Sequence, residues 1–148
     1  MKKTTMGKDA YYHIAWSPVH KYDKYSATRI VPDLAGIFCL LCKEGDRFRY
    51  LIFYSCWRDG CRIGLKKFLD QDMSKHIEIV RQLDFNNLYF RYTVIEESLK
   101  DMQDIMYWLV QTYSPEFNNA EGIRDSKRYA SIYLKETEID GDSILERL

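Results

Sequence analysis

Two neighbouring apolar segments, separated by a short turn, limit the possible folds more than any other feature of this chain. Residues 36–42 read Gly-Ile-Phe-Cys-Leu-Leu-Cys, and residues 47–55 read Arg-Phe-Arg-Tyr-Leu-Ile-Phe-Tyr-Ser. Glu44, Gly45 and Asp46 lie between them and are typical of a turn, so the pattern predicts an antiparallel β-hairpin. Both strands are almost continuously apolar, which indicates burial on two faces.

The segments after the hairpin alternate between helical and extended patterns. We expect a short helix over 62–69, a second helix capped by Ser74, a strand over 88–95, a long helix from Ser98 to Tyr113 ended by Pro115, and a strand over 129–134. This order predicts an α+β fold, with a small central antiparallel sheet of about three strands flanked by helices.

The length of 148 residues suits one hydrophobic core. We assign residues 31–119 to the domain itself. Residues 1–30 are aromatic but show no clear period, so we expect an extended arm packed on the domain. Residues 120–148 form a C-terminal extension, with the expected strand followed by a polar end.

Charge and cysteine usage restrict the partners and the compartment. Lysine plus arginine equals aspartate plus glutamate at 22 each, so a nucleic acid would have to be held by a local basic patch. No stretch approaches the roughly 20 apolar residues of a membrane span, and we expect a cytoplasmic protein without membrane contact. Cys39 and Cys42, three apart on a strand, point to opposite faces and cannot grip one ion. We expect all four cysteines, which include Cys56 and Cys61, to be reduced and buried.

Two stretches resemble the GIY-YIG domain of DNA-repair and homing endonucleases. Residues 31–38, Val-Pro-Asp-Leu-Ala-Gly-Ile-Phe, look like the family's I-P-x-x-P-G-I-Y entry. Residues 109–118, Leu-Val-Gln-Thr-Tyr-Ser-Pro-Glu-Phe-Asn, resemble the L-I-x-x-Y-x-P-x-Y-N ending of the domain in the excision-repair nuclease subunit. The resemblance covers about residues 30 to 119.

The resemblance implies a phosphodiester-cleaving site of two tyrosines, an arginine and a metal-holding glutamate. The tyrosine of the first strand is Phe38 here, and the glutamate position is Met106, whose thioether cannot hold magnesium. The Y-I-G position falls on Tyr50 to Ile52 by hairpin length, or on Phe53 to Ser55 by the following loop. Neither register restores the glycine.

The remaining family positions leave a partial site. We take Tyr50, Tyr54 and Arg62 as candidate catalytic residues, with Ser55 at the degenerate glycine position. The candidate binding residues are Arg58, Arg62 and Asn118.

Each of these residues also has a structural interpretation. The tyrosine rings can pack in the core while their hydroxyls reach solvent, and Arg62 can be a solvated surface charge. Met106 can be a core residue, and Asn118 can hold the chain after Pro115 in place by hydrogen bonds. Asp104, two residues before Met106, is turned about 200 degrees away on the helix and does not restore the metal site.

Three hypotheses of function follow. The first is a catalytically inactive GIY-YIG-like module that binds DNA, RNA or protein without a cofactor. The second is an active endonuclease that uses Mg²⁺ at a relocated site, with Glu96 or Glu97 as ligand. The third is a protein-interaction, assembly or inhibitor protein.

Overall fold

The computed structural model describes residues 1–139, which form seven strands and four α-helices. The strands are β1 (Lys2–Met6), β2 (Asp9–Trp16), β3 (His20–Lys21), β4 (Gly36–Glu44), β5 (Arg47–Cys56), β6 (Leu88–Val94) and β7 (Ser131–Glu138). The helices are α1 (Lys24–Ile30), α2 (Gly60–Phe68), α3 (Ile77–Val80) and α4 (Leu99–Tyr113), with a 3-10 turn at Phe85–Asn87. Within residues 1–139, no helix is long and apolar enough to span a bilayer.

The predicted α+β class and central antiparallel sheet are confirmed. The sheet has the order β3-β6-β4-β5, so β4 lies between β5 and β6 and pairs antiparallel with both. The predicted hairpin and the third strand are its three main members. The very short β3 adds a fourth strand at the β6 edge, which the sequence pattern did not indicate.

The central strand β4 separates two hydrophobic cores. Its first seven residues are all buried, and their side chains alternate between the faces of the sheet. Phe38 and Leu40 belong to the α2-side core, which α1, α2 and α3 cover. Ile37 and Cys39 belong to the α4-side core, which α4 and the second sheet cover.

An irregularity in the β4–β5 pairing decides where the strand tyrosines point. Leu40 pairs with Ile52, whereas the next residue, Leu41, pairs with Tyr50, so Leu51 is the extra residue of a β-bulge. Without the bulge, Tyr50 and Tyr54 would share a face, because they are four residues apart. With it, Tyr50 packs against the α4-side core and Tyr54 against the α2-side core.

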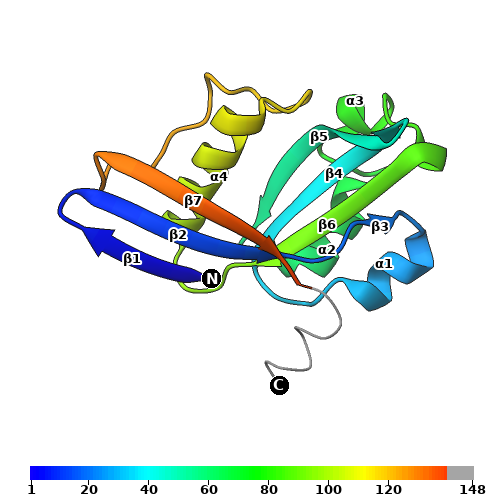
Figure 1. Cartoon of the computed structure of the whole chain (residues 1–148). Coiled ribbons are helices and arrows are strands. Elements are labelled where there is room, and N and C mark those ends of the chain that lie inside the picture. The colour runs from blue at the N-terminus through cyan, green and yellow to red at the C-terminus, as the bar shows by residue number, and fades with distance from the viewer. Residues whose placement is uncertain (140–148) are drawn as a thin grey trace.

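Most of the first sixteen residues form strands, so the segment 1–30 contains regular structure that its sequence did not indicate. β1 and β2 form an antiparallel hairpin, and β7 pairs in parallel with β2 to complete a second sheet of order β1-β2-β7 (Figure 1). Alternate residues of β2 are buried, but tyrosines occupy both an exposed and a buried position, Tyr11 and Tyr12. Because two tyrosines stand side by side, the alternation of buried and exposed residues was not visible in the sequence.

The C-terminal strand is confirmed, although its bounds are later than the 129–134 that we predicted. Through β7, the N-terminal arm and the C-terminal extension build one sheet together. Figure 1 shows this sheet beside the central sheet, with α4 (yellow) packed next to it. Residues 140–148, the polar end of the predicted extension, lie outside the described residues.

The long helix matches its prediction closely. The Ser98 hydroxyl accepts a hydrogen bond from the Asp101 N–H at 3.3 Å, and the helix ends at Tyr113 before Ser114 in the left-handed region. The second predicted helix is much shorter than expected. Ser74 is buried and precedes it by three residues, so it does not cap α3, whose N-cap is His76.

The glycine of the Gly-Ile-Phe segment gives a test of the fold. A Cβ at Gly36 would lie 2.1 Å from the Thr93 carbonyl oxygen and 2.9 Å from Cys61 Sγ. We predict that Gly36→Ala lowers the free energy of unfolding by about 3 kcal/mol or more, measured by urea denaturation, because the strand backbone cannot move aside. The exposed Gly122→Ala, whose nearest neighbour is the flexible Asn119 amide, should change it by under about 1 kcal/mol. Equal losses in the two variants would contradict this packing.

Candidate functional site

A pocket of about 530 Å³ opens where β5 ends, beside α2 and the loop that follows α2. We call it the Tyr54 pocket. Its walls come from residues 54–59, from the Gly64, Lys67 and Phe68 positions of α2, and from Asp70, Met73, Lys75 and His76 of the loop. Its size is in the usual range for small-ligand sites. Three sequence candidates, Tyr54, Ser55 and Arg58, line it.

The floor of the Tyr54 pocket is a cluster of rings. The buried Phe38 ring stacks on Tyr54 at 5.2 Å between centroids, and Phe68 meets the Tyr54 ring edge-on at 5.0 Å. His76 stacks on Phe68, and its Nε2 lies 3.3 Å from the Tyr54 hydroxyl. Burial raises the pKa of Tyr54 above its ordinary value, so the hydroxyl stays protonated at neutral pH.

The rim of the Tyr54 pocket carries three cations, Arg58, Lys67 and Lys75, and two carboxylates, Asp59 and Asp70. Lys67 pairs with Asp59 at 3.1 Å, whereas Arg58 and Lys75 have no ion-pair partner among residues 1–139. The charged residues of α2 itself are Arg62, Lys66 and Lys67. Residues 57–76 contain five lysines and arginines and three aspartates, which gives this region a small local excess of positive charge.

Two of the predicted catalytic residues lie away from this pocket. Arg62 lines a neighbouring groove of about 650 Å³ between α1 and α2, where its Nε donates to the Val31 carbonyl oxygen at 2.8 Å. Tyr50 is on the opposite face of the sheet, where its ring packs 4.5 Å from Tyr113 and its hydroxyl accepts from Arg91 at 3.2 Å. The fold does not bring Tyr50, Tyr54 and Arg62 together.

The predicted binding residue Asn118 holds a strand edge. Its side-chain oxygen accepts from the Phe53 N–H at 2.8 Å, and its amide nitrogen donates to the Phe53 carbonyl at 3.0 Å. Both ends of the amide are therefore used by the β5 backbone. This contact matches the structural interpretation of Asn118, the tie after Pro115.

The residue at the metal-holding position of the resembled GIY-YIG domain, Met106, does not suit a divalent cation. Met106 is half-buried on α4 and packs against the α4-side core, on the other side of the sheet from Tyr54. Glu96 and Glu97 are exposed, and Glu97 faces the N-terminal amine at 3.7 Å. Over residues 1–139, no three His, Cys, Asp or Glu side chains are grouped to hold a metal.

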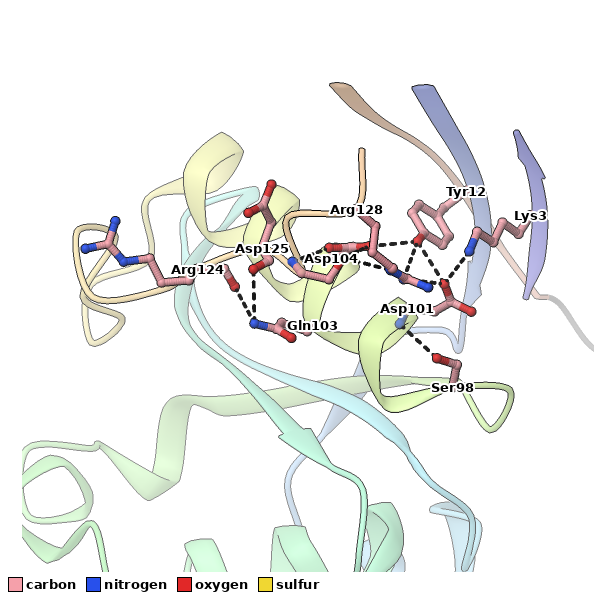
Figure 2. Close-up of polar contacts among 10 residues, drawn as sticks. Lys3, Tyr12, Ser98, Asp101, Gln103, Asp104, Arg124, Asp125 and Arg128 are labelled. Carbon is pink, nitrogen blue, oxygen red and sulfur yellow. Dashed lines mark hydrogen bonds and ion pairs between the residues drawn. The ribbon is translucent and has the colours of Figure 1, made fainter. Parts of the chain in front are cut away.

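The carboxylates that α4 does carry are buried in an ionic network (Figure 2). Asp101 Oδ1 lies 2.8 Å from Lys3 Nζ and 2.9 Å from Arg128 Nη2. Asp104 Oδ2 also lies 2.9 Å from Arg128 Nη2, and its Oδ1 accepts from the Ser126 N–H at 2.7 Å. The Tyr12 hydroxyl lies between the acids, 2.9 Å from Asp101 and 3.0 Å from Asp104.

This network joins three distant parts of the chain. Lys3 comes from β1, Tyr12 from β2 and Arg128 from the loop before β7, and all converge on one turn of α4. Two acids meet two cations, so the buried charge is balanced. Burial alone would raise the pKa of Asp101, but hydrogen bonds from Lys3, Arg128 and Tyr12 outweigh it and lower that pKa below 3.8. The carboxylates are occupied by structural contacts.

Sequence reasoning missed several residues of the Tyr54 pocket. Trp57, Lys67, Lys75 and His76 were not selected, although each lies within ten residues of α2. The available signal was the concentration of lysine and arginine over 57–76, where they make up five of twenty residues. A search for local composition, rather than for family positions, would have found it.

Comparison with known proteins gives a family. A protein-family model described as "Uncharacterised protein" matches residues 1–147. The chain belongs to this family. No curated protein matches it.

Three solved structures of one domain are similar to the chain. They are point mutants of the GIY-YIG N-terminal endonuclease domain of UvrC from Thermotoga maritima, bound to the catalytic divalent cation of that protein. Two of them are 15% identical to the chain, cover 66% of it and 99% of their own length, and have a TM-score of 0.44. The third is 14% identical. At this level the likeness is one of distant overall fold, and it assigns no activity.

The network on α4 predicts a pH-dependent stability. Because the Asp101 pKa is lowered in the folded state, the carboxylate stabilises the fold above its unfolded pKa of about 3.9, and this contribution is lost as the pH falls through the folded value. We predict that Asp101→Asn lowers the free energy of unfolding at pH 7 by on the order of 3 kcal/mol. The difference in free energy of unfolding between wild type and Asp101→Asn should decrease when urea denaturation is repeated at pH values from 5 towards 2.

The exposed Asp72→Asn is the matched control, since it makes the same change outside the network. It should alter the free energy of unfolding by less than about 0.5 kcal/mol at either pH. A loss in Asp101→Asn that stays constant down to pH 2 would show that the stabilisation does not come from the ionised carboxylate.

Proposed function

We propose that this chain is a nucleic-acid-binding module on a nuclease-like scaffold, without metal-dependent cleavage. One observation carries the proposal: the central sheet separates the exposed cations around α2 from the carboxylates of α4. A hydrolytic nuclease needs a base and a cation at the same phosphate, because charge develops on the phosphate oxygens during attack. Here the α4 carboxylates lie across the sheet from these cations, and the two carboxylates that line the Tyr54 pocket, Asp59 and Asp70, are held by Lys67 and by backbone N–H groups.

The groups around α2 suit binding. Arg58, Lys66 and Lys75 are exposed and have no salt-bridge partner within the described part of the chain, so each can approach a phosphate without first breaking an ion pair. Such contacts release counterions from the nucleic acid, and this release supplies affinity without sequence preference. The half-buried rings of Tyr54 and His76 in the adjacent pocket add surface on which a base can stack.

The groups available for cleavage are poorly placed. Tyr54 and Tyr50 both have a raised pKa because of burial, so neither is a ready base at neutral pH. Asp59 is engaged with Lys67, and Asp70 accepts the N–H groups of Asp72 and Met73. The α4 carboxylates are held by Lys3, Tyr12 and Arg128. These contacts favour binding over hydrolysis.

The first test is affinity for a fluorescein-labelled 20-nucleotide single strand, followed by fluorescence anisotropy. We predict that the double variant Arg58→Ala, Lys66→Ala weakens binding at least about fivefold at low salt. The slope of log affinity against log salt should fall by about 1.4, which corresponds to two lost phosphate contacts. Lys100→Ala, an exposed lysine on α4, is the control and should leave both quantities unchanged. Equal weakening by the α4 variant would place the contact elsewhere.

The second test is nuclease activity on supercoiled plasmid and on the same single strand, with Mg²⁺ or Mn²⁺. We predict no cleavage above the buffer control. Cleavage that depends on the metal and disappears in Arg62→Ala would overturn the proposal in favour of an active nuclease with a relocated metal ligand.

A further inference from the structure

Two free thiols meet where β5 passes into α2. Cys56 is the last residue of β5 and Cys61 is the second residue of α2, and the Cys56 thiol hydrogen-bonds to the Cys61 sulfur. Both side chains are buried, and Cys56 also lines the Tyr54 pocket. Two adjacent thiols can be oxidised together, because the second sulfur can attack a disulfide that forms at the first.

Two glycines leave room for these sulfur atoms. A Cβ at Gly64 of α2 would lie 2.2 Å from Cys56 Sγ, and a Cβ at Gly36 of β4 would lie 2.9 Å from Cys61 Sγ. Each sulfur therefore occupies space that a larger residue at the glycine position would take. Close packing of α2 on the sheet holds the two thiols in place, so their contact belongs to the folded core.

The other two cysteines are closer in sequence but are not arranged in this way. Cys39 belongs to the α4-side core and Cys42 to the α2-side core, so the sheet separates their side chains. A disulfide needs Cβ atoms roughly 4 Å apart, which opposite faces of a strand do not allow. Burial also raises the pKa of Cys39 to about 12, so its thiol stays protonated at neutral pH. The fold therefore distinguishes one cysteine pair from the other.

We propose that Cys56 and Cys61 are a modification site, which a low-molecular-weight disulfide oxidises to one reversible intramolecular disulfide. Cys56 reacts first, because it lines the pocket whereas Cys61 is fully buried. Its sulfur loses its proton to solvent and attacks the small disulfide, and one small thiol leaves. Cys61 then loses its proton and attacks the Cys56 sulfur of the mixed disulfide, and the second small thiol leaves. Two protein thiols are oxidised, and one small disulfide is reduced to two thiols.

The protonation of Cys56 sets the conditions of the test. Its hydrogen bond with Cys61, its burial and the neighbouring Asp59 carboxylate raise the pKa of Cys56 above its ordinary value. Because the thiolate is the attacking form, the exchange is slow at neutral pH and faster at about pH 9. The reagent is dipyridyl disulfide, a small disulfide whose thiol leaves readily.

The experiment incubates the full chain with excess dipyridyl disulfide, blocks the remaining thiols with N-ethylmaleimide in urea at neutral pH, and maps disulfides by trypsin digestion and mass spectrometry. Trypsin cleaves after Arg58, between the two cysteines, so their disulfide would join peptide 50–58 to peptide 59–62. Peptide 30–43 holds the other two cysteines. We expect the joined peptides, with both cysteines of peptide 30–43 blocked by maleimide. Free thiols should fall from four to two, and dithiothreitol should restore all four.

Two variants complete the test. Cys42→Ser is the matched control and should still give the joined peptides, whereas Cys61→Ser should stop at a mixed disulfide on Cys56. In the wild type, three results would each overturn the proposal: four unmodified thiols, a mixed disulfide on Cys56 without joined peptides, or a disulfide within peptide 30–43 formed to the same extent. The wild-type map decides by itself if a variant does not fold by circular dichroism. No nucleic acid is present, so these results leave the proposed function untouched.

Discussion

The burial of β4 on both faces is the constraint on which the rest of the structure depends. A strand without a polar face must be covered twice, so the chain needs a layer on each side of its sheet. The α2 side is covered by three helices, two of them short, and the α4 side by one long helix and a second sheet. Within β5, the bulge places Tyr50 on the α4 side of the sheet and Tyr54 on the α2 side.

The polar side chains on the two sides of the central sheet differ. On the α4 side, two aspartates are paired with Lys3 and Arg128 and tie the two ends of the described chain to one helix. A buried balanced network of this kind favours a unique arrangement of elements and leaves no carboxylate for a ligand. On the α2 side, lysine and arginine lie around an open pocket with aromatic walls. The two sides of the sheet therefore differ in their polar groups: paired and buried on the α4 side, and largely exposed on the α2 side.

Sequence patterns predicted the parts of the fold whose signals are local. The hairpin, β6 and α4 followed from apolar runs, turn residues and the Ser98 cap, and Met106 proved to be a packing residue as its place on the helical stripe indicated. The β-bulge at Leu51 left no local signal, yet it places Tyr50 and Tyr54 on opposite faces. The second sheet was missed because β2 and β7 pair across more than a hundred residues. The sequence predicted only part of the site. The positions of the resembled family led to Tyr54 and Arg58, but not to Trp57, Lys67 and Lys75 beside them.

The exposed cations around α2 and the buried carboxylates of α4 lie on opposite sides of the sheet, and NMR tests most directly which side binds nucleic acid. Amide signals of ¹⁵N-labelled protein would be followed while an unlabelled single-stranded oligonucleotide is added. We predict that the amide signals that shift lie mainly in residues 54–76, and that the signals of α4 and of the β1-β2-β7 sheet keep their positions. Shifts that are largest along α4, around Asp101 and Asp104, would contradict it.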